Sequence, residues 1–195
     1  MEPCFKRGED ALKGKRVILL TGPPRSGKST VAAKTAELLK SMGFKVGGVL
    51  TLEMVGDRGR IGFKLLDLWR GREGILALAG LGGPRIGKYG VNLGDLRDIG
   101  AGAIDIAIQE CDLIIIDEIG PMELLSEDFR GSVARALECG KPVLATIHYR
   151  MEDRLVREAK SRGDSILIEV SPSNRGELPA KLREAISNLL GGGLR

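Results

Sequence analysis

One eight-residue run constrains the fold of this chain more than any other feature: Gly22-Pro-Pro-Arg-Ser-Gly-Lys-Ser29 has the spacing GxxxxGK[ST]. A short apolar run, Arg16–Leu20, precedes it, and Ser29–Met42, with apolar residues at helical spacing, follows it. In such a strand–loop–helix unit, backbone N–H groups of the loop and of the helix N-terminus point towards phosphate oxygens. The pattern therefore predicts a nucleotide-phosphate site made of Gly22, Pro23, Pro24, Arg25, Ser26, Gly27, Lys28, Ser29 and Thr30.

Two side chains of this phosphate loop have predicted roles of their own. Lys28 is expected to reach the β- and γ-phosphates and to act as a catalytic cation. The Ser29 hydroxyl is expected to ligate Mg²⁺, the cofactor that the motif implies. Arg25 has two interpretations, a contact with the γ-phosphate or an exposed loop arginine. The second is favoured because arginine side chains are mostly exposed.

A second motif follows an apolar run later in the chain, where Leu113-Ile-Ile-Ile is succeeded by Asp117 and Glu118. An aspartate at the end of a buried strand beside a phosphate loop can hold Mg²⁺. The next residue leaves the strand at another angle, so Glu118 is expected to activate an attacking water as a general base. The alternative is a pair of solvent-facing acids. Glu123, a few residues on, is expected to face water.

Strand-like and helical stretches alternate along the chain, which predicts an α/β fold with a mostly parallel central sheet covered on both faces. Glu53–Arg72 is glycine-punctuated and is expected to form a β-hairpin with its turn near Asp57–Gly59. Asp95–Glu110 is expected to be helical, and Ser126 is expected to cap a helix that runs to about Cys139. We expect one domain over residues 15–190, with tails at 1–14 and 191–195.

Composition narrows the class of protein. Apolar residues make up 43% and charged residues 29%, the balance of a globular protein, and no apolar run reaches the roughly 18 residues that a membrane span needs. The N-terminus does not resemble a secretory signal, so a cytoplasmic location is expected. A net charge of +4 with interspersed acids argues against dedicated nucleic-acid binding. The three cysteines are expected to be reduced thiols, and a monomer is the default expectation.

The motifs together resemble the small P-loop nucleoside-triphosphatases of thermophiles, whose animal members are called cancer-related nucleoside-triphosphatases. The resemblance extends from about Gly14 to Leu190, and its most specific piece is Asp112-Leu-Ile-Ile-Ile-Asp-Glu-Ile-Gly-Pro-Met-Glu-Leu124. Supporting pieces are Gly47–Glu53, Arg60–Phe63, Gly87–Val91, Lys141–His148 and Ser173–Arg175.

This resemblance implies a RecA-like αβα sandwich and slow hydrolysis of ATP, GTP or other nucleoside triphosphates to the diphosphate and phosphate. It also implies that Asn174 and Arg175 lie near the nucleotide base. Two departures bear on the rate: Arg25 replaces a usual glycine of the phosphate loop, and Lys88 replaces a usual arginine. If that arginine stabilises charge in the transition state, Lys88 keeps the charge but loses the bidentate geometry, and catalysis is expected to be weaker.

Two other functions use the same phosphate loop. One is a kinase that transfers the γ-phosphoryl group to a small molecule or a nucleotide, with Gly80–Lys88 as a small lid. The other is a nucleotide-binding switch with little intrinsic turnover. His148 follows a predicted strand beside the acidic pair, and sensing of the γ-phosphate and a partly exposed strand-end residue are both open for it. No motif in the sequence identifies which nucleobase the site would prefer.

Overall fold

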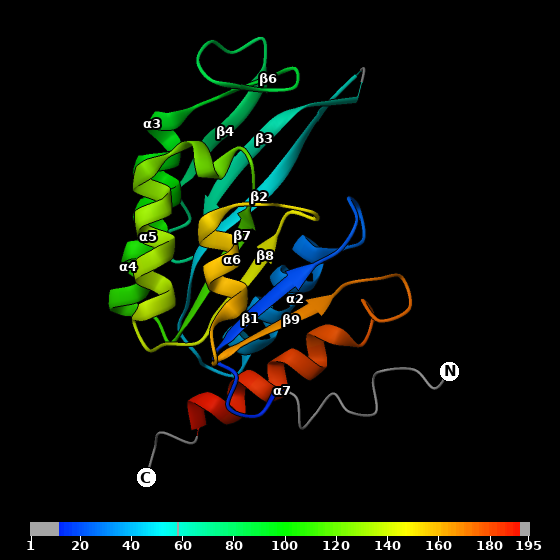
Figure 1. Ribbon diagram of the computed structural model, residues 1–195, viewed down its shortest axis with the longest axis vertical. Coiled ribbons are helices and arrows are strands. Elements are labelled where there is room, and N and C mark those ends of the chain that lie inside the picture. Colours follow the sequence, from blue (N-terminus) through cyan, green and yellow to red (C-terminus); the bar gives the residue numbers. More distant parts are fainter. Residues whose placement is uncertain (1–11, 58, 192–195) are drawn as a thin grey trace.

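A computed structural model describes residues 12–57 and 59–191, and in this part of the chain nine strands form one sheet (Figure 1). Their order across the sheet is β5-β6-β4-β3-β2-β7-β8-β1-β9. The strands are β1 (Val17–Thr21), β2 (Val46–Gly56), β3 (Gly59–Asp67), β4 (Glu73–Ala79), β5 (Arg85–Ile86), β6 (Tyr89–Val91), β7 (Leu113–Ile119), β8 (Val143–Ile147) and β9 (Ser165–Glu169).

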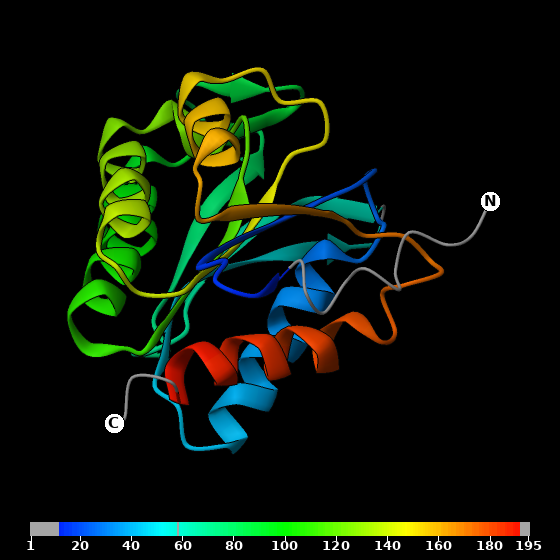
Figure 2. The ribbon, with the colours of Figure 1, turned by 60° about the horizontal axis from the view of Figure 1, so that its bottom comes forward.

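Helices cover both faces of this sheet. They are α2 (Lys28–Ser41), α3 (Leu93–Asp95), the π-helical η1 (Leu96–Ala101), α4 (Gly102–Glu110), the 3₁₀ turn η2 (Glu123–Leu125), α5 (Glu127–Glu138), α6 (Arg154–Ser161) and α7 (Leu178–Gly191). Figures 1 and 2 show α2 and α7 on one face and α4 and α5 on the other. The strands serve both layers, since in β7 Ile114 and Ile116 pack with α4 and α5 whereas Leu113 and Ile115 pack with α2 and α7.

The sheet has a parallel half and an antiparallel half. β2, β7, β8, β1 and β9 are parallel neighbours, as expected for strands joined by helical crossovers. β3, β4, β5 and β6 add four antiparallel pairings beyond β2, so the expected mostly parallel sheet is a mixed one. The αβα sandwich itself is confirmed.

The predicted hairpin is confirmed, but its first strand is longer than the sequence indicated. The hairpin was expected to begin at Glu53; in the structure its first strand is the end of β2, which begins at Val46. β2 pairs with β7 only as far as Val49 and continues to Gly56 paired with β3. No glycine or proline interrupts Leu50–Val55, so the strand continues past the end of the parallel half. The β2–β3 hairpin therefore projects beyond the body of the molecule (Figure 1).

Other expectations for local structure are confirmed. The Asp95–Glu110 stretch is helical, with the π-helical η1 in its first half. Ser126 caps α5, because its hydroxyl accepts a hydrogen bond from the Phe129 N–H. Cys111 and Cys139 are free thiols, whereas Cys4 lies outside the described residues.

The predicted tails lie mostly outside the described residues. Of the N-terminal tail only residues 12–14 are described, and Leu12 packs against the apolar cluster between the sheet and α2 and α7. Of the predicted C-terminal tail only Gly191 is described, and it is the last residue of α7. Across the described residues, no helix is both long enough and apolar enough to cross a bilayer.

Candidate nucleotide-binding and active site

The phosphate loop joins β1 to α2 and has a backbone that requires two of its glycines. Gly22 and Gly27 have φ angles of +142° and +107°, in the region that side chains with a Cβ rarely adopt. A Cβ on Gly22 would also lie 2.6 Å from the Val170 carbonyl oxygen. Gly27 is the N-cap of α2 and has no side chain to cap the first N–H groups of the helix. This N-terminus therefore presents N–H groups and the positive end of the helix dipole, which suit an anion.

Arg25 is exposed at the outer turn of the loop and has a φ angle of +65°. Glycine adopts this left-handed conformation freely, whereas a residue with a Cβ is strained there by about 1–2 kcal/mol. This conformation explains physically why a glycine is usual at this position in the family that the sequence resembles. The exposure agrees with the favoured interpretation of Arg25.

The residues predicted to act on phosphate and metal meet where β1, β7 and β8 end. The Lys28 ammonium group donates to the Gly22 carbonyl oxygen at 3.2 Å and lies 3.7 Å from Oε1 of Glu118. The Ser29 hydroxyl donates to Oδ1 of Asp117 at 3.0 Å. β8 separates β7 from β1 in the sheet, and it supplies Thr146, whose hydroxyl donates to the same Oδ1 at 2.6 Å.

Burial controls the charge of the carboxyl groups in this cluster. Asp117 is 1% exposed, and its burial raises the pKa of the carboxyl group against the hydrogen bonds from Thr146 and Ser29. Burial also raises the pKa of Glu118 to about 7, although the charge of Lys28 acts in the opposite direction. A carboxyl group that titrates near neutral pH is suited to accept a proton from water.

Glu123 does not face water, and the expectation for it was wrong. It is 5% exposed in η2, the turn that follows β7. Its burial, together with the charge of Glu118, raises the pKa of its carboxyl group to about 8. Gly120 lies between the two acids, since a Cβ there would be 2.8 Å from Oε2 of Glu123 and 3.2 Å from Oε2 of Glu118. The turn η2 places Glu123 beside the acidic pair, and the position of Glu123 in the sequence does not reveal this.

The donors at this edge fit a magnesium ion. Oδ2 of Asp117 is buried and has no hydrogen-bond partner among the described residues, and the Ser29 hydroxyl is held beside the same carboxylate. Both are oxygen donors of the kind that Mg²⁺ prefers, and Mg²⁺ keeps several waters and needs few protein ligands. No group of three or more histidine, cysteine, aspartate or glutamate side chains suited to a metal occurs in the described part of the chain. In a site with these two donors, phosphate and water oxygens would therefore supply the remaining ligands of Mg²⁺.

Two residues were expected near the nucleotide base. Arg175 lies beside the phosphate loop, whereas the side chain of Asn174 forms hydrogen bonds within the turn after β9. A Cβ on Gly27 would lie 3.2 Å from Cδ of Arg175. The Asn174 side chain instead stabilises the turn after β9: its amide donates to the Glu169 carbonyl oxygen at 2.8 Å, and its oxygen accepts from the Ser171 N–H at 2.9 Å. The geometry therefore favours Arg175 over Asn174 for a contact with nucleotide.

Lys88 is not brought together with Lys28 and Glu118. Lys88 lies between β5 and β6, at the outer edge of the antiparallel half of the sheet. β6 is four strand spacings from β7, which is roughly 19 Å at about 4.8 Å per spacing. Its ammonium group donates to the Arg60 carbonyl oxygen at 3.2 Å and lies 5.3 Å from the centre of the Tyr89 ring. A catalytic role for Lys88 stays a prediction that this geometry does not favour.

Sequence reasoning missed Thr146 and the burial of Glu123. Thr146 is fully buried within the otherwise apolar strand β8, and a hydroxyl at that position is a signal that could have indicated a polar partner. Glu123 carried no such signal, because a glutamate in a turn is exposed by default.

The arrangement defines the class of the protein: an αβα sandwich with parallel strands that end at a phosphate loop, a buried aspartate and a glutamate is a P-loop nucleotide-binding protein. A protein-family model described as NTPase matches residues 17–183. The chain belongs to this NTPase family.

Relatives along nearly the whole length support the assignment. The chain is 49% identical to the nucleoside-triphosphatase THEP1 of Thermofilum pendens over 175 residues, which are 89% of this chain and 96% of that protein. It is 47% identical to the THEP1 protein of Methanosarcina acetivorans, with 89% of this chain and 98% of that protein covered.

Two solved structures share the fold. The crystal structure of THEP1 from Aquifex aeolicus has a TM-score of 0.78 at 31% identity and covers 87% of this chain and 98% of that one. The solution structure of a human cancer-related nucleoside triphosphatase has a TM-score of 0.72 at 32% identity, over 92% of this chain and 99% of that one. The resemblance drawn from the sequence motifs is confirmed.

Proposed function

We propose that this protein hydrolyses nucleoside triphosphates, ATP and GTP among them, to the diphosphate and phosphate in a Mg²⁺-dependent reaction. The observation that carries the proposal is the meeting of Lys28, Glu118, Asp117 and Ser29 at one edge of the sheet. The names of its relatives, nucleoside-triphosphatases, support the same reaction.

The residues divide the work by their positions. The N–H groups at the start of α2 and the Lys28 ammonium group bind the phosphates, and they stabilise the charge that gathers on the γ-phosphoryl oxygens in the transition state. Mg²⁺, held by Ser29 and Asp117, would neutralise charge on the β- and γ-phosphate oxygens. Thr146 holds the Asp117 carboxylate in place through its hydrogen bond to Oδ1.

Glu118 supplies the base. Its carboxylate orients a water molecule and accepts its proton as the water oxygen bonds to the γ-phosphorus and the bond from phosphorus to the bridging oxygen breaks. The electron pair of the broken bond stays on the diphosphate. A kinase would need a pocket for the acceptor in place of this water.

Phosphate release by the purified protein with MgATP and MgGTP tests the proposal. We expect the parent protein to release phosphate without an added acceptor, and Lys28→Ala to release none that can be measured. Lys34→Ala is the matched control, because Lys34 is an exposed lysine of the same helix, and it should keep the parental rate. Turnover that appears only with an added acceptor would indicate a kinase, and equal rates in Lys28→Ala and the parent would contradict the proposal.

A further inference from the structure

The only histidine of the chain, His148, stands directly after β8. β8 is the strand between β7, which ends in the acidic pair, and β1, which leads into the phosphate loop. The carboxyl end of β8 therefore lies between the two halves of the proposed site. None of the roles assigned above uses His148.

Strand alternation indicates which side of the sheet the histidine faces. In β8, Leu144 packs with α2 and α7, and Thr146, two residues on, donates to Asp117. The His148 N–H still donates to the Ile119 carbonyl oxygen of β7 at 3.3 Å, so the backbone follows β7 to this point. Extending this alternation by one residue past β8 would place the side chain of His148 on the face of Thr146, the face on which α2 begins with Lys28.

The ring of His148 carries a polar atom that the described residues do not satisfy. Its Nδ1 is buried and has no hydrogen-bond partner among them. The same holds for Oγ of Ser26, a phosphate-loop residue that is 7% exposed, and for Oδ2 of Asp117. Buried polar atoms without partners cost free energy, and these three belong to the phosphate loop, to β7 and to the residue after β8, so a polar ligand bound between these segments would complete them.

The loop that carries His148 is fastened to the segment that follows Glu118. The Arg130 guanidinium group binds both carboxylate oxygens of Asp153 at 2.9 and 3.3 Å and donates to the Leu124 carbonyl oxygen at 2.7 Å. His148 itself accepts a hydrogen bond from the Met151 N–H at 3.2 Å. The backbone of His148 is thus held beside the end of β7, the strand that carries Glu118.

We propose that the His148 imidazole hydrogen-bonds the terminal phosphate of a bound nucleoside triphosphate and so makes the site distinguish the triphosphate from the diphosphate. The inference rests on the proposed function. The γ-phosphate is the group that extends past Lys28 towards Glu118, and an imidazole N–H can donate to its oxygens. A diphosphate has no group at this place and leaves the imidazole contact unmade.

A side-chain NMR measurement tests the contact directly. The untagged protein gives one set of imidazole signals because the chain contains one histidine. With Mg²⁺ and a non-hydrolysable ATP analogue the His148 imidazole signals should shift, and with MgADP they should stay close to their positions in the nucleotide-free protein. Equal shifts with both nucleotides, or none with either while both bind, would overturn the proposal.

Calorimetric titration of variants tests the consequence for affinity. His148→Ala should weaken binding of the ATP analogue about tenfold, the scale of one hydrogen bond to a charged group, and leave ADP binding within about twofold. His148→Asn, which retains a donor, should recover part of the difference. Glu152→Ala, an exposed position in the same loop, is the control and should keep the parental ratio of the two affinities. A purely structural role would weaken both nucleotides together.

Failure of this inference is distinguishable from failure of the proposed function. A parent that binds neither nucleotide and releases no phosphate would contradict the proposed function. A parent that hydrolyses ATP while His148→Ala keeps the parental ratio of ATP-analogue to ADP affinity would overturn only the role of His148.

Discussion

At the scale of single residues, two influences act in opposite directions on Glu118. Burial raises the pKa of its carboxyl group to about 7, and the Lys28 ammonium group 3.7 Å away lowers it. A general base works in its carboxylate form, so protonation below this pKa removes activity. We expect kcat/KM to fall about tenfold per pH unit below about pH 7 and to level off above it, because this parameter reports the free enzyme.

Variants assign this pH dependence to Glu118. Glu118→Gln should lose about 10²-fold or more in kcat while still binding Mg²⁺ and nucleotide, which titration calorimetry measures. Glu127→Gln removes a carboxylate whose side chain is 93% exposed and should behave as the parent. A parental rate in Glu118→Gln would remove Glu118 from the mechanism.

Glu123 leads to a prediction about stability. Its carboxyl group has a pKa of about 8 in the folded protein against an ordinary value of 4.5. Between these values the folded state holds a proton that the unfolded chain has released, so the free energy of unfolding falls as pH rises. Glu123→Gln stays neutral and avoids this loss.

We therefore expect Glu123→Gln to match the parent at about pH 4.5 and to be more stable by a few kcal/mol at about pH 8. Urea denaturation at both pH values, without nucleotide or Mg²⁺, measures the difference. Glu127→Gln is again the control for loss of an exposed carboxylate. A variant less stable than the parent at pH 8 would show that the Glu123 carboxylate is stabilising.

At the scale of elements, the β2–β3 hairpin and the β5–β6 pair are joined by a hairpin cluster made of Glu53, Arg60, Phe63, Lys88 and Tyr89. Arg60 is its centre: the guanidinium group donates to Glu53 at 2.7 Å and to the Tyr89 hydroxyl at 3.2 Å, and it lies 4.9 Å from the centre of the Phe63 ring. Lys88 binds the Arg60 backbone. The cluster explains how an exposed extension of the sheet keeps its conformation.

This arrangement predicts that Lys88→Ala changes kcat by less than about threefold, because a loss of transition-state charge stabilisation would be far larger. Hydrogen exchange of β3 and β6 amides should instead become faster, since the variant loses one of the contacts that tie the two elements. Lys88→Arg retains the charge and should exchange as the parent does. A large fall in kcat at unchanged KM would support the catalytic role inferred from the family resemblance.

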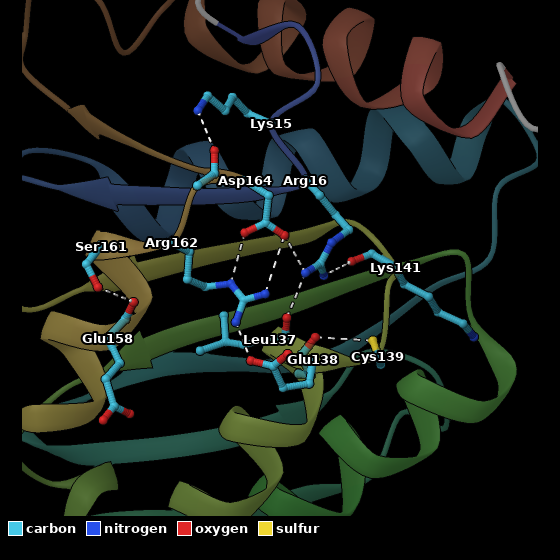
Figure 3. Close-up of polar contacts among 12 residues, drawn as sticks. Lys15, Arg16, Leu137, Glu138, Cys139, Lys141, Glu158, Ser161, Arg162 and Asp164 are labelled. Carbon is cyan, nitrogen blue, oxygen red and sulfur yellow. Dashed lines mark hydrogen bonds and ion pairs between the residues drawn. The ribbon is translucent and has the colours of Figure 1, made fainter.

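At the scale of the whole molecule, an ionic network lies at the ends of the strands that are opposite the phosphate loop (Figure 3). Arg16, immediately before β1, donates to the Lys141 and Leu137 carbonyl oxygens at 2.8 and 2.7 Å and to Asp164 at 2.6 Å. Arg162 also binds Asp164 and pairs with Glu138. The network thereby ties the starts of β1, β8 and β9 together.

Arg16→Met should lower the free energy of unfolding by about 2–3 kcal/mol, because partly buried carbonyl and carboxylate groups lose a charged donor. Its kcat should stay parental, since the network lies at the other end of the strands. The control is Arg154→Met, whose side chain is 86% exposed and pairs with Glu158; it should leave the free energy of unfolding close to the parental value. Denaturant titration of the three proteins decides between these outcomes, and equal stability of Arg16→Met and the parent would show that the network is dispensable.

Local patterns were sufficient to predict several parts of the protein. The phosphate loop, the buried strand that carries Asp117 and the Ser126 cap each depend on a few consecutive residues, whose spacing fixes backbone conformation and burial. The hairpin turn near Asp57–Gly59 is equally local. The length of β2 was not predictable in this way, because its continuation depends on β3 as a partner after β7 has ended.

The sequence by itself determined the αβα class and the residue types of the proposed phosphate and Mg²⁺ site, because motif spacing and apolar periodicity are properties of neighbouring residues. Only the tertiary structure decided which distant side chains share an environment. It buried Glu123 beneath Glu118, brought Thr146 to Asp117 and kept Lys88 at the far edge of the sheet. Strand order sets these distances, and strand order results from packing across the whole chain.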